Sequence, residues 1–212
     1  MPDIDEKTKR LALILEQVKK EETNTINFVI PQIFSKKAAS YMLIEEDLLH
    51  AKEAIETLIN IKDNIPEIMA ISLWRSAISS YGKCFNSNNG GYSVLNLNCF
   101  DGQEELRVIH NSLMLLRNSY VSHRDETEHE NVLVIMKIPK GEGADMSEIE
   151  CRLKSLITAT PPMDNLKDFL RIIDFLLPVT REKIKNQTQR TYEGFVDFIK
   201  TLPVDQLKVL TI

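Results

Sequence analysis

Apolar residues recur at every third or fourth position over most of the chain, which is the spacing of amphipathic helices. The predicted helices cover residues 4–20, 36–62, 66–85 and about 102–123. A last apolar stripe, from Leu166 to Leu202, predicts one long helix, or two helices that meet at Pro178 because proline lacks a backbone N–H group. The helix of residues 66–85 is apolar around most of its circumference, so we expect it at the centre of a bundle. We expect helix 102–123 to pack beside it as an antiparallel neighbour.

Two of these helices carry signals for where they start. Ser35 is placed to cap the second predicted helix, because a serine hydroxyl accepts a hydrogen bond from a first-turn N–H group. Pro66 suits the first turn of the third helix, where no backbone donor is needed.

Two shorter segments have the pattern of β-strands. Residues 132–138 form a β-branched apolar run, and residues 148–157 alternate between apolar and polar side chains. A glycine-containing connection joins them, so the sequence predicts an antiparallel hairpin over about 131–158. A helix over residues 147–158 is the competing interpretation.

These elements predict a mainly α protein, a helical bundle of four to five main helices with an inserted β-hairpin. The chain has 212 residues, which fits a single domain, and its seven glycines and eight prolines are too few for a many-turned β protein. The expected parts are an N-terminal helix with a loop, core helices, the hairpin and a long C-terminal helix. They cover residues 1–34, 35–124, 131–158 and 162–202.

Charge and composition narrow the classes of partner. The net charge of −5 disfavours general nucleic-acid binding, so DNA is not an expected partner and any RNA contact must use a few focused cations. No apolar stretch has the length of a membrane span, and the opening residues lack a secretory pattern, so we expect a cytoplasmic protein with no membrane contact. The three cysteines form no CxxC pair and are expected as free thiols. Phosphate-binding glycine loops and serine-hydrolase motifs are absent from the sequence.

The most specific string ends the helix predicted over 102–123. Arg117 and Asn118 stand side by side, and His123 follows six positions after the arginine. A guanidinium presents a planar fork to phosphate oxygens, and an imidazole exchanges protons near neutral pH. Asn118 could orient the histidine or donate to a phosphate oxygen. On an ideal helix Arg117 and His123 are about 240° apart, so a shared site needs a frayed last turn or a cleft that both enter from different sides.

The string HNSLMLLRNSYVSH, residues 110–123, resembles the motif of the HEPN superfamily (higher eukaryote and prokaryote nucleotide-binding domains). The resemblance covers about residues 36–124 and implies an all-helical fold with Arg117, Asn118 and His123 as site residues. It further implies a homodimer in which the motifs face each other. Catalytic members of the family are ribonucleases that need no metal and no cofactor, and we expect neither here.

Three more residues are candidates for supporting the motif. His110 lies two turns before Arg117 on nearly the same face, where it could extend a polar groove, although a surface or helix–helix position is the default. Arg75 follows Trp74 in an apolar helix and is expected to pair with a buried carboxylate or carbonyl, or to reach the Arg117 cleft. Tyr120 can pack in the apolar stripe and still present its hydroxyl to a partner.

Two classes of function remain open. The first is a HEPN-like module without catalysis, which binds a ligand, a protein partner or a second copy of itself. The second is a metal-independent endoribonuclease of the toxin or anti-phage type, with RNA as substrate and an antitoxin as a further partner. The basic residues near the helix end could simply stabilise its negative pole, and the acidic residues at 125–130 oppose RNA binding. The spacing of His123, Asp125, Glu128 and His129 matches no metal site.

Overall fold

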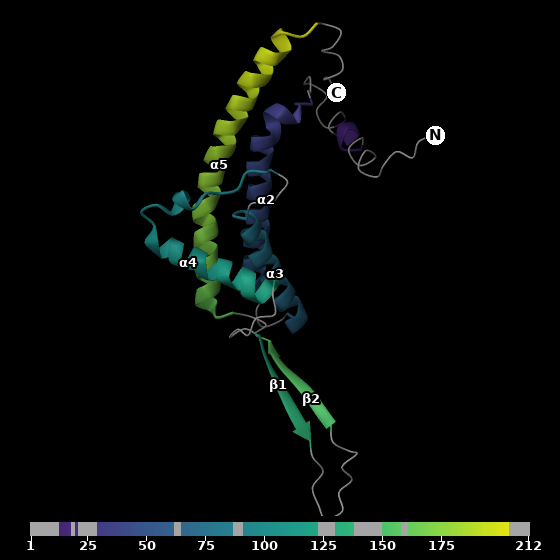
Figure 1. Ribbon diagram of the computed structural model, residues 1–212, viewed down its shortest axis with the longest axis vertical. Helices are drawn as coiled ribbons and strands as arrows, with labels where there is room; N and C mark the ends of the chain where they lie inside the picture. The colour runs from purple at the N-terminus through teal and green to yellow at the C-terminus, as the bar shows by residue number, and fades with distance from the viewer. Residues whose placement is uncertain are drawn as a thin grey trace, which may run out of the picture. The chain divides into compact units, whose positions relative to one another are not determined.

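The structure is a computed structural model in which most of the chain is helical, so the predicted mainly α class is confirmed (Figure 1). It describes residues 13–17, 20, 29–61, 65–86, 91–122, 130–137, 150–157 and 161–203. The helices are α2 (Gln32–Ile61), α3 (Glu67–Lys83), the 3-10 turn η1 (Leu97–Phe100), α4 (Glu104–Leu116), the π-helix η2 (Arg117–Ser122) and α5 (Met163–Lys200). Residues 13–17, inside the first predicted helix, are also helical.

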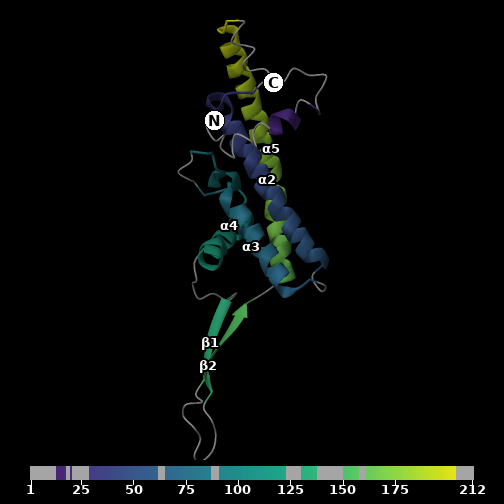
Figure 2. The same cartoon turned by 90° about the vertical axis from the view of Figure 1, so that its right-hand side faces the viewer.

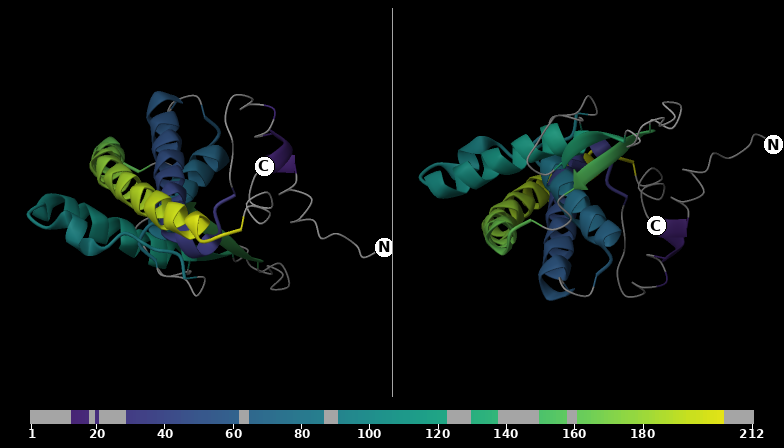
Figure 3. Two further views of the ribbon diagram at one scale, coloured as in Figure 1. Left: turned by 90° about the horizontal axis from the view of Figure 1, so that it is seen from above. Right: turned by 90° about the horizontal axis from the view of Figure 1, so that it is seen from below.

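The chain divides into two compact units, and the larger unit, residues 40–183, holds the main core. In Figure 3 the helices α2, α3, α4 and α5 group around a common centre. As expected, α3 is deeply buried: Trp74 and Tyr81 are at most 1% exposed and both meet the Phe169 ring of α5 edge-on, with centroids 5.8 and 5.4 Å away. These rings and the aliphatic stripes of the four helices supply the hydrophobic stabilisation of the unit.

Helices α2 and α5 run antiparallel within this unit. Lys52 of α2 contacts Asp174 at 2.7 Å, whereas the earlier residue Glu45 accepts from the later residue Arg181 at 2.6 Å. Figures 1 and 2 show the two helices side by side. Since these ion pairs are solvent-exposed, the apolar stripe between the helices holds them together and the charges contribute little.

Helix α4 crosses α3 instead of running antiparallel to it, so the expected arrangement is wrong (Figure 2). In an antiparallel pair the end of one helix lies beside the start of the other. Here Gly82, near the end of α3, faces the side chain of Arg117, which directly follows α4. The physical reason is that Gly82 has no side chain, so the C-terminal end of α4 can pass close to the C-terminal end of α3.

The predicted helix over 102–123 is present, but its pitch changes within it. Regular α-helical hydrogen bonding ends at Leu116, and residues Arg117–Ser122 form the π-helix η2. A π-helix bonds each N–H group to the carbonyl five residues back and is found frequently at functional sites. The change of pitch therefore coincides with the first residue of the predicted motif.

The smaller unit comprises residues 1–39 and 184–212. Its α2 segment starts at the carbonyl of Pro31, which accepts from the backbone N–H groups of Phe34 and Ser35. The prediction of Ser35 as the cap is therefore wrong: its hydroxyl lies in the first turn and donates to the carbonyls of Ile30 and Pro31. Proline at the start costs no hydrogen bond, which explains the earlier beginning of the helix.

Two strands lie in the segment where the sequence predicts a hairpin. Strand β1 (Glu130–Lys137) pairs antiparallel with β2 (Glu150–Ile157), with Glu130 opposite Ile157 and Lys137 opposite Glu150. Residues 150–157 are thus extended and not helical. The connection between the strands lies outside the described residues.

No helix in the described part of the chain combines the length and the apolar character that crossing a membrane requires.

Helix α5 continues through Pro178, which decides between the two interpretations of the last apolar stripe. Proline inside a helix leaves a carbonyl without its partner and crowds the turn before it.

Because the Pro178 side chain is exposed, Pro178→Ala loses no core packing. We expect the variant to raise the free energy of unfolding by about 1–3 kcal/mol, after allowance for the looser unfolded chain. Urea denaturation measures this change, with Lys185→Ala on the same helix as the near-neutral control, and an unchanged or lower stability would contradict it.

Candidate functional site

Arg117 is held at the crossing of two helices. It is the first residue of η2, and the stem of its side chain lies against Gly82 of α3. A Cβ atom built on Gly82 would stand 2.9 Å from Cγ and 3.4 Å from Cδ of Arg117. Since real Cβ atoms do not approach other carbons that closely, the path of the arginine stem depends on glycine at this position.

Two neutral amides contact the guanidinium of Arg117. Its Nη1 donates to Oδ1 of Asn118 at 2.9 Å. Asn86 faces the same group, and because a guanidinium carries only donors, the amide oxygen is the atom that satisfies both sides. In that orientation it accepts from Nη1 and Nη2, each at 3.1 Å.

Among the described residues these contacts leave one edge of the guanidinium without a hydrogen-bond partner. Arginine has five N–H donors, and the two amides use both hydrogens of Nη1 and one of Nη2. The remaining donors, Nε–H and the neighbouring Nη2–H, form the side edge that binds two oxygens of one oxyanion. Among the described residues no carboxylate lies within ion-pair distance of Arg117, so its charge is not compensated there.

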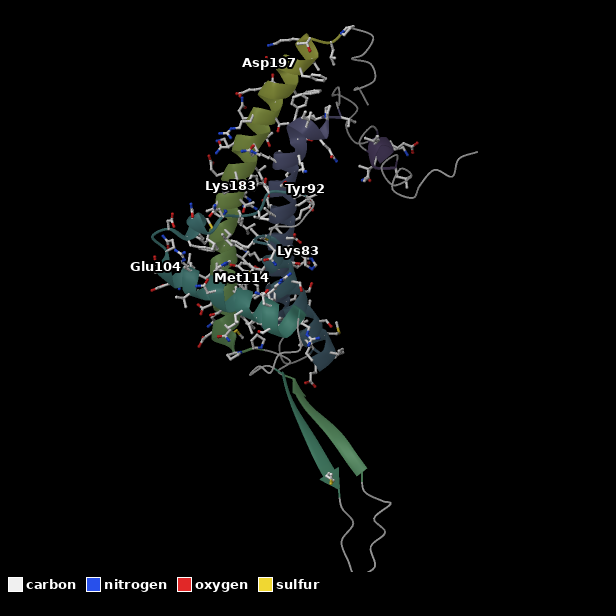
Figure 4. All side chains as sticks on the ribbon, viewed as in Figure 1. Lys83, Tyr92, Glu104, Met114, Lys183 and Asp197 are labelled. Carbon is white, nitrogen blue, oxygen red and sulfur yellow. The ribbon has the colours of Figure 1, made fainter. Side chains whose placement is uncertain are left out.

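A cleft of about 350 Å³ opens beside this guanidinium. Helix α2, the end of α3, the segment 92–94 and η2 form its walls. Its polar lining includes Asp47, Lys83, Asn86, Tyr92, Ser93 and Arg117. In Figure 4 the labelled Lys83 and Tyr92 lie on the side of the bundle away from Glu104, the first residue of α4.

The charges that line the cleft sum to +1 in a chain whose net charge is −5. Lys83 and Arg117 are cationic, and Asp47 is the single carboxylate among the lining residues. Asp47 accepts from Lys83 Nζ at 3.2 Å, in a pair exposed enough to be weak. Arg117 is therefore the cation of the cleft that has no carboxylate partner among the described residues, whereas Lys83 is paired with Asp47.

The segment before η1 fixes the outer wall of the cleft. The backbone N–H of Ser93 donates to the Ser40 hydroxyl at 3.0 Å, and that of Leu95 donates to the Cys84 carbonyl at 2.8 Å. Tyr92 directly precedes this anchored segment, lines the cleft and is 43% exposed. A half-exposed aromatic ring on a cationic cleft can stack on a planar group of a ligand.

The structure thus brings together Arg117 and Asn118 of the predicted motif. His123 directly follows η2 in the sequence and lies outside the described residues, as do the acidic residues 125–129. The backbone of Tyr120 is part of η2, but its side chain also lies outside the described part of the chain. Arg75 is not among the residues that line the cleft.

His110 lies in a buried aromatic cluster and not in the Arg117 cleft. It is 4% exposed, its Nδ1 shares a hydrogen bond of 2.8 Å with the Tyr81 hydroxyl, and the ring centroids of Phe85 and Phe100 lie 4.4 and 5.0 Å away. Of the placements predicted for it, a polar groove, the surface or a helix–helix contact, the last is the one observed. Burial, helped by the nearby charge of Arg107, lowers the pKa of His110 to about 4, so the ring is neutral at pH 7.

Other chemistry finds little support in the described residues. Cys84 and Cys99 are free thiols there, and burial raises the pKa of the Cys84 thiol to about 12, which keeps it from acting as a nucleophile. Within the described ranges no three His, Cys, Asp or Glu side chains come together as a metal site would require.

Sequence reasoning missed Gly82, Lys83, Asn86 and Tyr92 as parts of the cleft. Gly82 carried a signal, because an isolated glycine inside a helical pattern often marks a close approach of another backbone or side chain. Asn86 and Tyr92 belong to a polar segment whose composition indicates only a loop. No protein-family model, curated protein or solved structure matches the chain.

The buried imidazole makes the stability of the fold depend on pH. In the unfolded chain His110 takes up a proton near its ordinary pKa of 6.5, whereas the folded protein resists protonation down to about 4. The unfolded state therefore binds more protons between these values, and stability falls as the pH is lowered through this window, by up to about 1.4 kcal/mol per pH unit.

Urea denaturation at several pH values between 4 and 7 measures this slope. We expect His110→Leu to flatten it and His50→Gln, which removes an exposed histidine, to leave it intact. An equal slope in the wild type and His110→Leu would contradict the assignment.

Proposed function

We propose that the chain is a HEPN-like binding module that takes a phosphate group of RNA in the Arg117 cleft without cleaving it. The observation that carries the proposal is the Arg117 guanidinium on a cleft of about 350 Å³, which has no carboxylate partner and two unused N–H groups among the described residues. The contacts that the described residues make to it come from neutral amides, which orient the guanidinium without cancelling its charge. The HEPN resemblance of residues 110–123 supports the same function.

RNA fits the remaining features of the cleft. The side edge of a guanidinium matches two oxygens of a phosphate, in charge and in spacing. Tyr92 offers a ring for a base adjacent to that phosphate. A single-stranded ligand can expose both groups at once, whereas the acidic chain repels an extended duplex everywhere else. In the proposal two copies of the chain pair with these clefts facing each other, as the family resemblance implies.

Binding of a 2′-O-methylated oligouridylate tests the proposal, because this probe has the phosphates of RNA but no free 2′-hydroxyl for self-cleavage. Fluorescence anisotropy measures its affinity for the wild type and for Arg117→Ala. We expect the substitution to weaken binding roughly 10- to 100-fold, the range for losing a charge-assisted hydrogen-bond pair of about 1.5–3 kcal/mol. Arg117→Lys keeps the charge without the fork and should fall between the two.

Arg107→Ala is the matched control, since it removes an exposed arginine of α4 that does not line the cleft. Added salt should weaken wild-type binding by lowering the phosphate contribution. Equal affinities of Arg117→Ala and Arg107→Ala would remove the proposal.

A second candidate function, a metal-independent endoribonuclease, is favoured by the π-helix η2. This rare element begins at Arg117 and ends at Ser122, one residue before the histidine of the motif. Cleavage of RNA by its own 2′-hydroxyl needs a base, an acid and a cation for the developing phosphorane charge. In this candidate His123 of one copy takes the proton of the 2′-hydroxyl and His123 of a second copy gives a proton to the leaving 5′-oxygen. Arg117 stabilises the charge, and Asn118 orients His123 or donates to a phosphate oxygen.

Cleavage of unmodified RNA separates the two candidate functions. The endoribonuclease predicts cleavage by the wild type that persists in excess chelator and falls at least about 100-fold in both Arg117→Ala and His123→Ala. The binding module predicts no cleavage by any of them, with RNA retained by the wild type. Cleavage that is equal in all three proteins would exclude this site as the source of activity.

A further inference from the structure

Asn86 stands at the end of α3 in a backbone position that is itself anchored. Its N–H group donates to the carbonyl of Gly82 at 3.2 Å, which closes the last turn after the helix. Two residues earlier, the Cys84 carbonyl accepts from the backbone N–H of Leu95, which ties the end of α3 to the segment before η1. The Asn86 side chain is half-buried and reaches the guanidinium from this fixed point.

The contact that Asn86 makes determines which edge of Arg117 is free. Its oxygen bridges Nη1 and Nη2, the end edge of the guanidinium, and Asn118 takes the outer hydrogen of Nη1. The side edge with Nε–H is the one that remains. A planar, delocalised group held at two adjacent edges cannot turn about its long axis without losing these bonds.

The choice of an amide matters as much as its position. A carboxylate at residue 86 could accept the same two hydrogen bonds, but it would also cancel the positive charge. An amide fixes the group and leaves the charge for a ligand.

We infer that Asn86 is a positioning residue, which holds Arg117 with its side edge open to the phosphate of a ligand in the cleft. The inference rests on the proposed function for its binding readout. Gly82 has the complementary role of admitting the arginine stem, and together the two residues of α3 set the path and the rotation of the guanidinium.

Affinity for the 2′-O-methylated oligouridylate gives the first test. We expect Asn86→Ala to weaken binding roughly three- to tenfold, the range for losing neutral hydrogen bonds that orient a group. The same change should have less than about a twofold effect in an Arg117→Lys background, because an ammonium has no edge to orient. Asn111→Ala, on the exposed face of α4, is the matched control.

The side-chain ¹⁵N resonances of Arg117 in the free protein give a second test that needs no ligand. Held at two edges, the Nη groups should give separate signals with slow rotation, and Asn86→Ala should merge them. Asn86→Asp should keep the separate signals yet weaken RNA binding more than tenfold, because the carboxylate still orients the guanidinium but offsets its positive charge. A merely structural role would not separate the two readouts, because a loss of local structure would merge the signals and weaken binding together.

The two tests distinguish failure of the inference from failure of the proposed function. A wild type that binds no oligouridylate, with Arg117 signals that still merge in Asn86→Ala, would remove the function and leave the positioning role. Unchanged signals in Asn86→Ala, or an equal loss of affinity in the Arg117→Lys background, would overturn the role of Asn86.

Discussion

The close approach of the Arg117 stem to Gly82 is the constraint on which the candidate site depends. It brings the end of α4 to the end of α3, and the cleft exists only where these two ends, α2 and the segment 92–94 meet. A larger residue at position 82 would have to displace the middle of the arginine side chain, not its flexible tip. The packing of the arginine stem on Gly82 thus determines where the guanidinium lies, and its hydrogen bonds determine how it is turned.

The aromatic cluster around His110 keeps α4 in place for this approach. Tyr81 precedes Gly82 by one residue and bonds the His110 ring, while Phe85 and Phe100 enclose the same ring. A neutral imidazole suits the cluster, because it fills space like another aromatic ring and satisfies the buried tyrosine hydroxyl. His110 therefore stabilises the crossing of α3 and α4 from inside the core.

Periodicity was enough to predict the helices α2, α3, α4 and α5, since each of them buries an apolar stripe that is visible in the sequence. It also placed Arg117 and Asn118 together, because neighbours in sequence stay neighbours in space. It failed where one residue changes local geometry: Pro31 starts α2 ahead of Ser35, and Gly82 lets α4 cross α3. Asn86 and Lys83 reach the cleft through tertiary packing, which the spacing of residues in the sequence does not encode. The prediction for His123 stays untested, because this residue lies outside the described part of the chain.

The π-helix η2 has a consequence for the way this motif could change. A π turn accommodates one residue more than an α turn, so η2 is equivalent to a single insertion that the helix absorbs without breaking. Loss of that one residue would restore a regular α-helix without turning the segment beyond it to another side, because the π turn has already absorbed the extra residue. The chain would keep its fold, whereas side chains within the turn, where Arg117 and Asn118 begin the motif, would change direction around the axis. The length of this segment therefore matters to the site as much as its composition.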